Sequence, residues 1–131
     1  APDHVCFWDG ASRELFVGDM LVLGSTVMIP AGRGGHLAQY LASLARLAAL
    51  APVRAYPGHG AAIEDPAALI AEYVRHRAQR ESEVRACLAA GMTAVDEIVE
   101  RIYGPLSQPV RGAATATVLA HLEKLREDGL L

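Results

Sequence analysis

Two stretches, residues 14–19 (ELFVGD) and residues 53–60 (VRAYPGHG), share one pattern: apolar residues, then glycine, then a side chain that can bind a metal. Short apolar runs that end at glycine or proline predict short β-strands followed by tight loops. Loops at strand ends converge into sites in layered α/β folds. Carboxylate oxygen and imidazole nitrogen are both zinc donors. Asp19 and His59 are therefore candidate ligands, although each motif on its own is also compatible with a plain turn.

The flanking sequence places both motifs in an α/β layer. Residues 5–8 (VCFW) and 14–17 are short apolar runs separated by the turn-forming residues 9–13 (DGASR), which predicts a hairpin. From His36 the apolar period changes to 3.6 and continues until shortly before Pro52, which predicts an amphipathic helix. Residues 53–56 then predict a strand. The expected order of hairpin, helix and strand is typical of an α/β layer.

The rest of the chain is expected to be helical. Asp65 is a good N-cap with Pro66 at the first helical position, and Gly91 is expected to end that long helix. Residues 93–96 (TAVD) resemble a capping box that opens a second helix, which stops at residues 104–105 (GP). A last helix is expected over residues 112–128. We place the domain boundary at 64/65, giving domains 1–64 and 65–131, with the long helix bridging them.

Composition narrows the function classes. The chain has 131 residues, 52% apolar and 21% charged, with a net charge of -3, which fits a folded domain and not an obligate nucleic-acid binder. It contains no apolar run long enough to span a bilayer and no signal-peptide pattern at its first residues. Cys6 and Cys87 lie far apart in apolar surroundings. We interpret them as buried thiols in a reducing, cytoplasmic setting.

Several charged side chains have two interpretations. A basic cluster on the long helix is expected to pair with neighbouring glutamates on a solvated face, or else to contact a nucleic-acid backbone. His76 is expected to be packed and hydrogen-bonded, or to brace the site, and His36 to be an exposed residue of a first helical turn. Thr117 and His121 lie on the face that a DNA-reading helix would present. The basic cluster consists of Arg75, Arg77, Arg80 and Arg85, and its expected partners are Glu72, Glu81 and Glu83.

Read together, residues 16–20 (FVGDM) and 55–60 (AYPGHG) resemble the last two metal-ligand motifs of the metallo-beta-lactamase superfamily. Further resemblances lie in residues 2–7 (PDHVCF), 24–27 (GSTV), 40–44 (YLASL), 73–81 (YVRHRAQRE) and 117–131. The chain is most similar to the C-terminal half of the lactamase-beta-2-like and glyoxalase-II-like branches. The resemblance implies the C-terminal half of an αββα metallo-beta-lactamase sandwich, followed by a helical, winged-helix-like domain.

The resemblance also implies roles for three residues. Asp19 matches the carboxylate that bridges two zinc ions, and His59 matches a ligand of the second ion. His4 matches a position close to the site that is not itself a ligand. The family's His-x-His-x-Asp-His element and its other Pro-Gly-His element are absent from these 131 residues. We therefore assign no catalytic residue and expect this chain alone to bind zinc weakly and to be inactive.

By resemblance, the complete enzyme hydrolyses an ester, a thioester or a single-stranded RNA phosphodiester with water activated by the metal ions. Its expected partners are the missing N-terminal half or a second copy, forming a homodimer, and no membrane is expected as a partner. The alternative function is a winged-helix-type binding or dimerisation module. Residues 93–131 carry four basic and six acidic side chains, which argues against strong double-stranded DNA binding.

Overall fold

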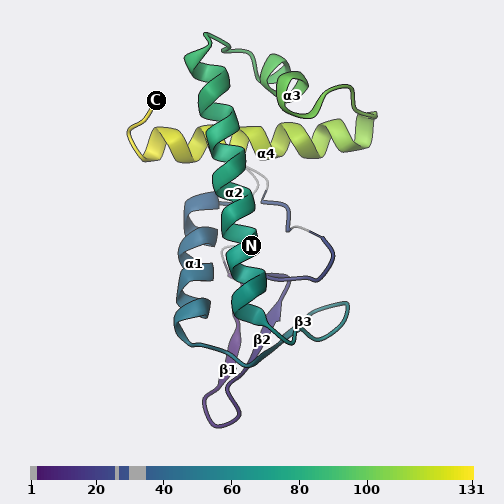
Figure 1. The fold of residues 1–131 in the computed structure, drawn as a ribbon, viewed down its shortest axis with the longest axis vertical. Coiled ribbons are helices and arrows are strands. Elements are labelled where there is room, and N and C mark those ends of the chain that lie inside the picture. The colour runs from purple at the N-terminus through teal and green to yellow at the C-terminus, as the bar shows by residue number, and fades with distance from the viewer. Residues whose placement is uncertain (1–2, 26, 30–34) are drawn as a thin grey trace. The chain divides into compact units, whose positions relative to one another are not determined.

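The computed structural model describes residues 3–25, 27–29 and 35–131 (Figure 1). The described residues form three short strands and four helices: the three strands and one helix make up the first part and three helices follow in the second, which confirms the α/β class. In chain order the elements are β1 (Phe7–Asp9), β2 (Glu14–Gly18), α1 (Leu37–Ala49), β3 (Arg54–Pro57), α2 (Pro66–Ala89), α3 (Val95–Tyr103) and α4 (Gln108–Glu127).

The strands form one sheet in the order β1-β2-β3. Strands β1 and β2 are the two arms of the predicted hairpin and pair antiparallel, with Trp8 opposite Leu15. Strand β3 pairs parallel to β2, with Leu15 opposite Ala55 and Phe16 opposite Tyr56. Parallel strands need a long crossover connection, and α1 lies in that connection. The C-terminal ends of β2 and β3 therefore lie at the same edge of the sheet.

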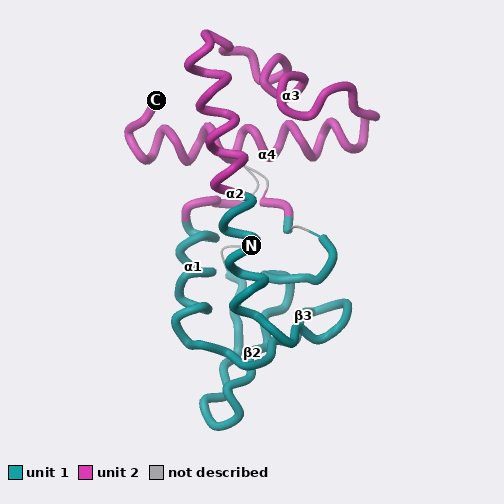
Figure 2. Tube along the Cα trace, viewed as in Figure 1, with its two compact units in different colours: residues 1–27, 39–76 teal, residues 28–38, 77–131 magenta. Residues whose placement is uncertain are grey.

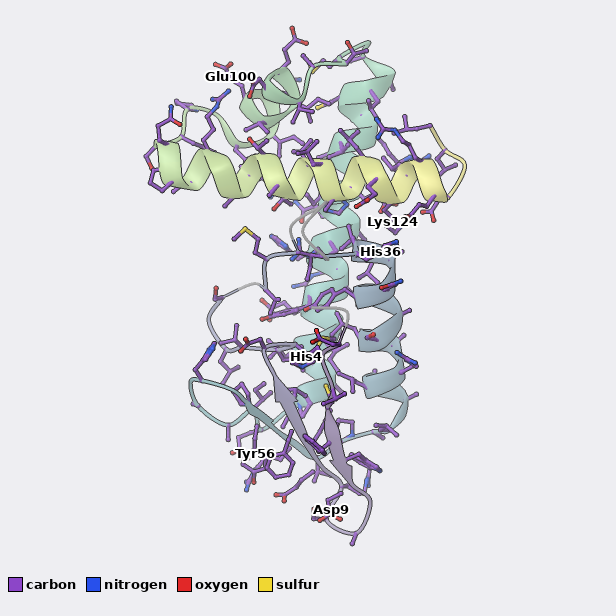
Figure 3. The ribbon with its side chains drawn as sticks, turned by 180° about the vertical axis from the view of Figure 1, so that it is seen from behind. His4, Asp9, His36, Tyr56, Glu100 and Lys124 are labelled. Atoms are coloured by element: carbon purple, nitrogen blue, oxygen red, sulfur yellow. The ribbon has the colours of Figure 1, made fainter. Side chains whose placement is uncertain are left out.

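The two faces of the sheet differ in exposure because side chains alternate along each strand. Leu15, Val17 and Ala55 are buried, and Figures 1 and 3 show α1 and the first half of α2 on one face of the sheet. On the other face Phe7 and Phe16 are 69% and 47% exposed. Phe16 stacks on Tyr56 with ring centroids 5.1 Å apart. An aromatic row thus crosses the sheet on its open face.

The helices of this region begin as predicted. Helix α1 buries the expected positions, among them Leu37, Leu44 and Leu47. Helix α2 starts at Pro66, and Asp65 accepts a hydrogen bond from the Ala68 amide through Oδ1 at 3.0 Å. This bond satisfies one of the free amides of the first turn.

The chain forms two compact units (Figure 2). Unit 1 consists of residues 1–27 and 39–76, and unit 2 of residues 28–38 and 77–131. Helices α1 and α2 each contribute residues to both units. The proposed domain boundary at 64/65 stays a prediction. None of the helices among the described residues is long and apolar enough to cross a membrane.

Unit 2 has a core of its own that includes Val84, Ile98, Val99, Val118 and Leu125. Two predictions about its helices are wrong in detail. The N-cap of α3 is Ala94, without a side-chain cap, so the TAVD sequence is no capping box. Acidic residues in its first turn, Asp96 and Glu97, interact favourably with the helix dipole instead. Helix α4 begins at Gln108 rather than at residue 112, because Pro109 lies in the first turn, where its missing amide costs nothing.

Candidate metal centre

The structure brings Asp19 and His59 into direct contact. Nε2 of His59 lies 3.0 Å from Oδ1 of Asp19, and the two side chains are 76% and 70% exposed. Asp19 directly follows β2, and His59 lies two residues after β3. Their proximity follows from the parallel pairing, which places both strand ends at one edge of the sheet. The exposure leaves the facing nitrogen and oxygen accessible to a ligand.

Two glycines allow the strand ends to approach this closely. The Gly58 amide donates a hydrogen bond to the Gly18 carbonyl at 2.8 Å. A Cβ on Gly58 would lie 3.1 Å from Oδ1 of Asp19 and 3.5 Å from the Gly18 backbone. Gly18 has a φ of +52°, a conformation that residues with a Cβ adopt at a cost. Glycine is therefore required at position 18 by its backbone angle and favoured at position 58 by close approach.

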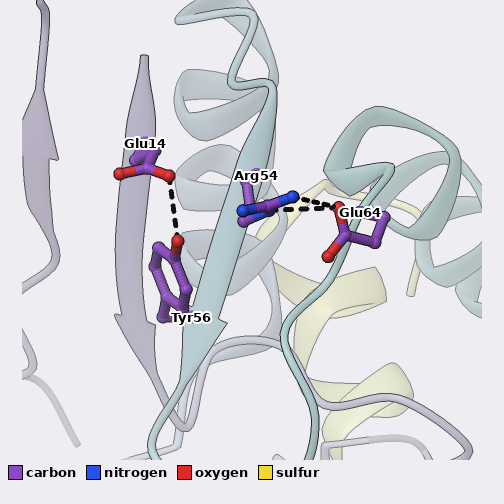
Figure 4. Close-up of polar contacts among 4 residues, drawn as sticks. All are labelled: Glu14, Arg54, Tyr56 and Glu64. Carbon is purple, nitrogen blue, oxygen red and sulfur yellow. Dashed lines mark hydrogen bonds and ion pairs between the residues drawn. The ribbon is translucent and has the colours of Figure 1, made fainter. Parts of the chain in front are cut away.

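The loop that carries His59 is closed at its base. Ala55 and Ile63 exchange two backbone hydrogen bonds of 2.9 and 2.8 Å. Arg54 donates two hydrogen bonds to Oε2 of Glu64 (Figure 4). Tyr56 donates to Oε1 of Glu14 at 2.9 Å and so ties β3 to β2. These contacts restrain both ends of the loop, while His59 itself projects into solvent.

His4 contacts the backbone beside Asp19. Its Nε2 donates to the Val17 carbonyl at 2.9 Å, which requires the proton on Nε2 because a carbonyl only accepts. A Cβ on Gly18 would lie 2.7 Å from Cε1 of His4, so the imidazole packs on the Gly18 backbone. Figure 3 shows His4 at the end of the hairpin opposite its turn, where Asp9 lies. His4 is thus hydrogen-bonded to the end of β2, and its role near a metal stays a prediction.

Sequence reasoning missed two tyrosines that hold the loop after Asp19. The Tyr40 hydroxyl donates to the Met20 carbonyl at 2.9 Å. The Tyr73 hydroxyl lies 2.7 Å from the Val22 carbonyl and 3.2 Å from the Val22 amide. Both side chains are buried and lie among apolar residues of their helices, a pattern that by itself indicates only a core position. The signal is the hydroxyl, since a buried tyrosine usually bonds through it.

The Asp19–His59 pair fits zinc in its donor chemistry and spacing. Two donors on one tetrahedral zinc ion lie roughly 3.3 Å apart, close to the 3.0 Å between Nε2 of His59 and Oδ1 of Asp19. A catalytic zinc site uses three protein ligands. Within the described parts of the chain, no three His, Cys, Asp or Glu side chains form such a group. The pair therefore supplies part of a coordination sphere.

The arginines of the basic cluster on α2 differ in burial and in their contacts. Arg80 pairs with Glu83, as predicted, and its guanidinium carbon lies 4.4 Å from the Tyr103 ring centroid. Arg77, by contrast, is buried, so the prediction that it lies on a solvated face is wrong. His76 is exposed, which contradicts the packed role predicted for it. The helix turns its basic residues in different directions, and the charge pattern alone does not identify which one faces the core.

Two other histidines belong to unit 2. His36 is half-buried and pairs with Glu127 through Nε2 at 2.8 Å. His121 is fully buried, so its side chain does not lie on an exposed helix face that could contact DNA. Burial, together with the charge of Arg77, lowers the pKa of His121 to about 4. The thiols of Cys6 and Cys87 are free; Cys87 is buried and Cys6 only half-buried.

Two family models match different parts of the chain. Residues 1–59 match the metallo-beta-lactamase superfamily. Residues 94–131 match the beta-lactamase associated winged helix domain. The first match includes both Asp19 and His59, and the second covers α3 and α4.

Individual relatives match nearly the whole of this chain. A lactamase-like protein from Penicillium aethiopicum, vrtG, is 39% identical over 98% of this chain and 43% of its own length. The beta-lactamase-like protein 2 homolog of Caenorhabditis elegans is 32% identical over 98% of this chain and 42% of its own. The chain thus spans about two fifths of the length of these relatives.

Solved structures show the same fold. A metallo-beta-lactamase family protein from Thermus thermophilus superposes with a TM-score of 0.72 and 30% identity, over 95% of this chain and 40% of its own. A beta-lactamase domain protein from Burkholderia ambifaria superposes with a TM-score of 0.79 and 27% identity, over 95% and 39%. The chain therefore belongs to the metallo-beta-lactamase superfamily and carries a beta-lactamase associated winged helix domain at its C-terminus.

Proposed function

We propose that this chain is part of a metal-dependent hydrolase in which Asp19 and His59 are two of the metal ligands. One observation carries the proposal: a carboxylate and an imidazole, brought together from two strand ends, face each other at 3.0 Å and are accessible to solvent. Superfamily membership supports a hydrolytic reaction, and the donor types support zinc as the ion.

The chain's own residues would hold and orient the ions. In two-metal hydrolases the ions polarise the substrate and activate the attacking water. The exposed side chains of Asp19 and His59 would hold them through Oδ1 and Nε2. His4 would keep the end of β2, just before Asp19, in place through its bond to the Val17 carbonyl. The Gly58–Gly18 hydrogen bond would fix the distance between the two ligand-bearing loops.

The proposed substrates are esters, thioesters or single-stranded RNA, the classes that the resemblance to the lactamase-beta-2-like and glyoxalase-II-like branches implies. An assay of the complete protein against a thioester, a simple ester and a single-stranded oligoribonucleotide separates these classes. Turnover of only one of them, lost in an Asp19→Ala variant, identifies the substrate class.

We propose that the 131-residue chain alone binds zinc weakly and does not turn over substrate, because its described residues supply only two donors at the site. The remaining donors would come from the N-terminal half of the protein or from a second copy. The exposed aromatic row on the sheet supports the existence of such a partner, since Phe7 and Phe16 leave a large apolar area in water. The free thiols of Cys6 and Cys87 support a reducing, cytoplasmic location.

Calorimetric titration with zinc tests the ligand assignment. We expect weak binding to the chain that disappears in an Asp19→Ala, His59→Ala double variant. An Asp96→Ala, His76→Ala double variant is the matched control, because it removes the same two residue types from exposed positions elsewhere. Equal zinc binding by all three proteins would contradict the assignment. Submicromolar binding or hydrolysis by the chain alone would contradict the need for a partner.

A further inference from the structure

The loop that follows Asp19, residues 20–25, contains no helix or strand. The loop is anchored by the buried side chain of Leu21 and by several hydrogen bonds to its backbone. Backbone amides and carbonyls near a core need partners, and a loop cannot supply them from a ladder of its own. Whatever holds this loop also determines where Asp19 points, because Asp19 is the residue immediately before it.

Two helices supply those partners through tyrosine hydroxyls. From α1, Tyr40 donates to the Met20 carbonyl at 2.9 Å. From α2, the Tyr73 hydroxyl contacts three backbone groups: the Val22 amide at 3.2 Å, the Val22 carbonyl at 2.7 Å and the Ser25 carbonyl at 2.8 Å. All of these residues belong to unit 1.

The hydroxyls act on a segment that is restrained on its other side as well. The Met20 amide donates to the Val17 carbonyl at 3.0 Å, and the same carbonyl accepts from His4. The turn around Asp19 is therefore held before the residue by His4 and after it by Tyr40 and Tyr73. The Asp19 side chain is 70% exposed, so its position depends on this backbone more than on packing.

We propose that Tyr40 and Tyr73 are positioning residues of the metal centre: their hydroxyls fix the loop after Asp19 and thereby keep its carboxylate opposite His59. The inference rests on the proposed function, since this placement matters for catalysis only if Asp19 binds an ion. It adds a role for α1 and α2, which cover the sheet and contribute no ligand of their own.

The test removes one hydroxyl at a time. Tyr73→Phe and Tyr40→Phe keep the ring, which is buried at both positions, and delete only the hydrogen bonds. Tyr103→Phe is the matched control, because Tyr103 belongs to unit 2. Thermal unfolding monitors the stability of every variant. If Tyr73→Phe does not fold, Tyr40→Phe decides the question, because the Tyr40 hydroxyl bonds the same loop at the Met20 carbonyl.

The first readout is the nitrogen NMR shift of the His59 imidazole in metal-free protein, with Asp19→Ala as the reference for a lost contact. We expect Tyr73→Phe to move this shift towards the Asp19→Ala value and to accelerate amide exchange at Val22. Tyr103→Phe should leave both unchanged. A His59 shift identical to that of the unmodified chain would overturn the inference, even if Val22 exchanged faster, because the loop would then move without moving Asp19.

The second readout is zinc affinity. Residues that orient metal ligands change metal affinity by about 10–100-fold, so we expect at least a tenfold loss in Tyr73→Phe and none in Tyr103→Phe. Unchanged affinity in Tyr73→Phe would overturn the positioning role. If the chain binds zinc no better than its Asp19→Ala, His59→Ala variant, the proposed metal site fails, and the His59 shift alone then decides whether the tyrosines position the pair.

Discussion

The Gly58 amide donates a hydrogen bond to the Gly18 carbonyl at 2.8 Å, and each glycine directly precedes one of the two candidate ligands. Parallel pairing brings β2 and β3 together, and this bond continues the pairing beyond the regular ladder, where the register shifts between Phe16 and Gly18. The separation of Asp19 from His59 is therefore set by the backbone and not by the exposed side chains.

Gly58→Ala is expected to disturb the pair with little loss of stability. The new Cβ would lie 3.1 Å from Oδ1 of Asp19, and this exposed carboxylate can move away from it. We expect weaker zinc binding by calorimetry and a loss in the free energy of unfolding below about 1 kcal/mol. Gly112→Ala is the control. It lies within α4 with open space around it, so it should raise stability by about 0.5–1 kcal/mol and leave zinc affinity unchanged. Undiminished zinc affinity in Gly58→Ala would contradict the prediction.

Gly18→Ala is expected to destabilise the protein through two separable effects. Its φ of +52° costs about 1–2 kcal/mol for a residue with a Cβ, and the new Cβ would lie 2.7 Å from Cε1 of His4. In a His4→Ala background the second effect is absent. Chemical denaturation should therefore give a smaller cost for Gly18→Ala in that background than in the unmodified chain. Equal costs in both would show that His4 does not pack on Gly18.

Acid is expected to destabilise unit 2 through His121. Burial and Arg77 lower the pKa of this histidine from 6.5 to about 4 in the folded protein, against the opposing charge of Glu81. Because the unfolded chain then binds a proton that the folded chain does not, the free energy of unfolding falls as pH decreases from about 6.5 to about 4. A shift of this size corresponds to about 3 kcal/mol.

Denaturation curves measured across that pH window test the effect. His121→Leu should flatten the pH dependence, whereas His76→Leu, which replaces an exposed histidine of α2, should leave it unchanged. The same pH slope in His121→Leu and in the unmodified chain would assign the acid sensitivity to other groups.

The open edge and face of the sheet predict self-association of the chain alone. Val5 and Phe7 are 66% and 69% exposed, and β1 is an edge strand within the described sheet. Unpaired edges and apolar patches favour pairing between copies. Sedimentation should therefore show dimers or larger species as concentration rises. Phe7→Lys should shift the chain towards monomer, and Val110→Lys, an exposed position on α4, should not. A monodisperse monomer at high concentration would contradict this prediction.

Local sequence signals predict the helix boundaries where one or two residues determine the backbone conformation. Asp65 and Pro66 fix the start of α2, and Gly91 with its φ of +86° follows the end of that helix. The candidate pair could also be anticipated, because Asp19 and His59 each follow a strand. The distance between Asp19 and His59 could not be predicted, because it depends on the register between β2 and β3, which no local pattern specifies.

Other features depend on packing between distant segments. Arg77 and His76 are neighbours in a charged stretch, yet the first is buried and the second exposed, because α2 packs within both units and its hydrophobic period is interrupted there. Tyr40 and Tyr73 could be assigned to helix stripes, but their hydroxyl partners lie in a loop far away in sequence. The predicted start of α4 at residue 112 is wrong because Pro109 and Gly112 resemble helix breakers, although Pro109 is harmless in a first turn.

The parallel pairing of β2 with β3 also determines when the candidate site can exist during folding. The β1–β2 hairpin is local and can form early, but β3 can dock on β2 only after the intervening chain has closed a long loop and formed α1. Asp19 and His59 therefore meet at a late, non-local step. Partial unfolding that releases β3 would separate them while the hairpin and the helices of unit 2 persist, so loss of the site should precede loss of most secondary structure.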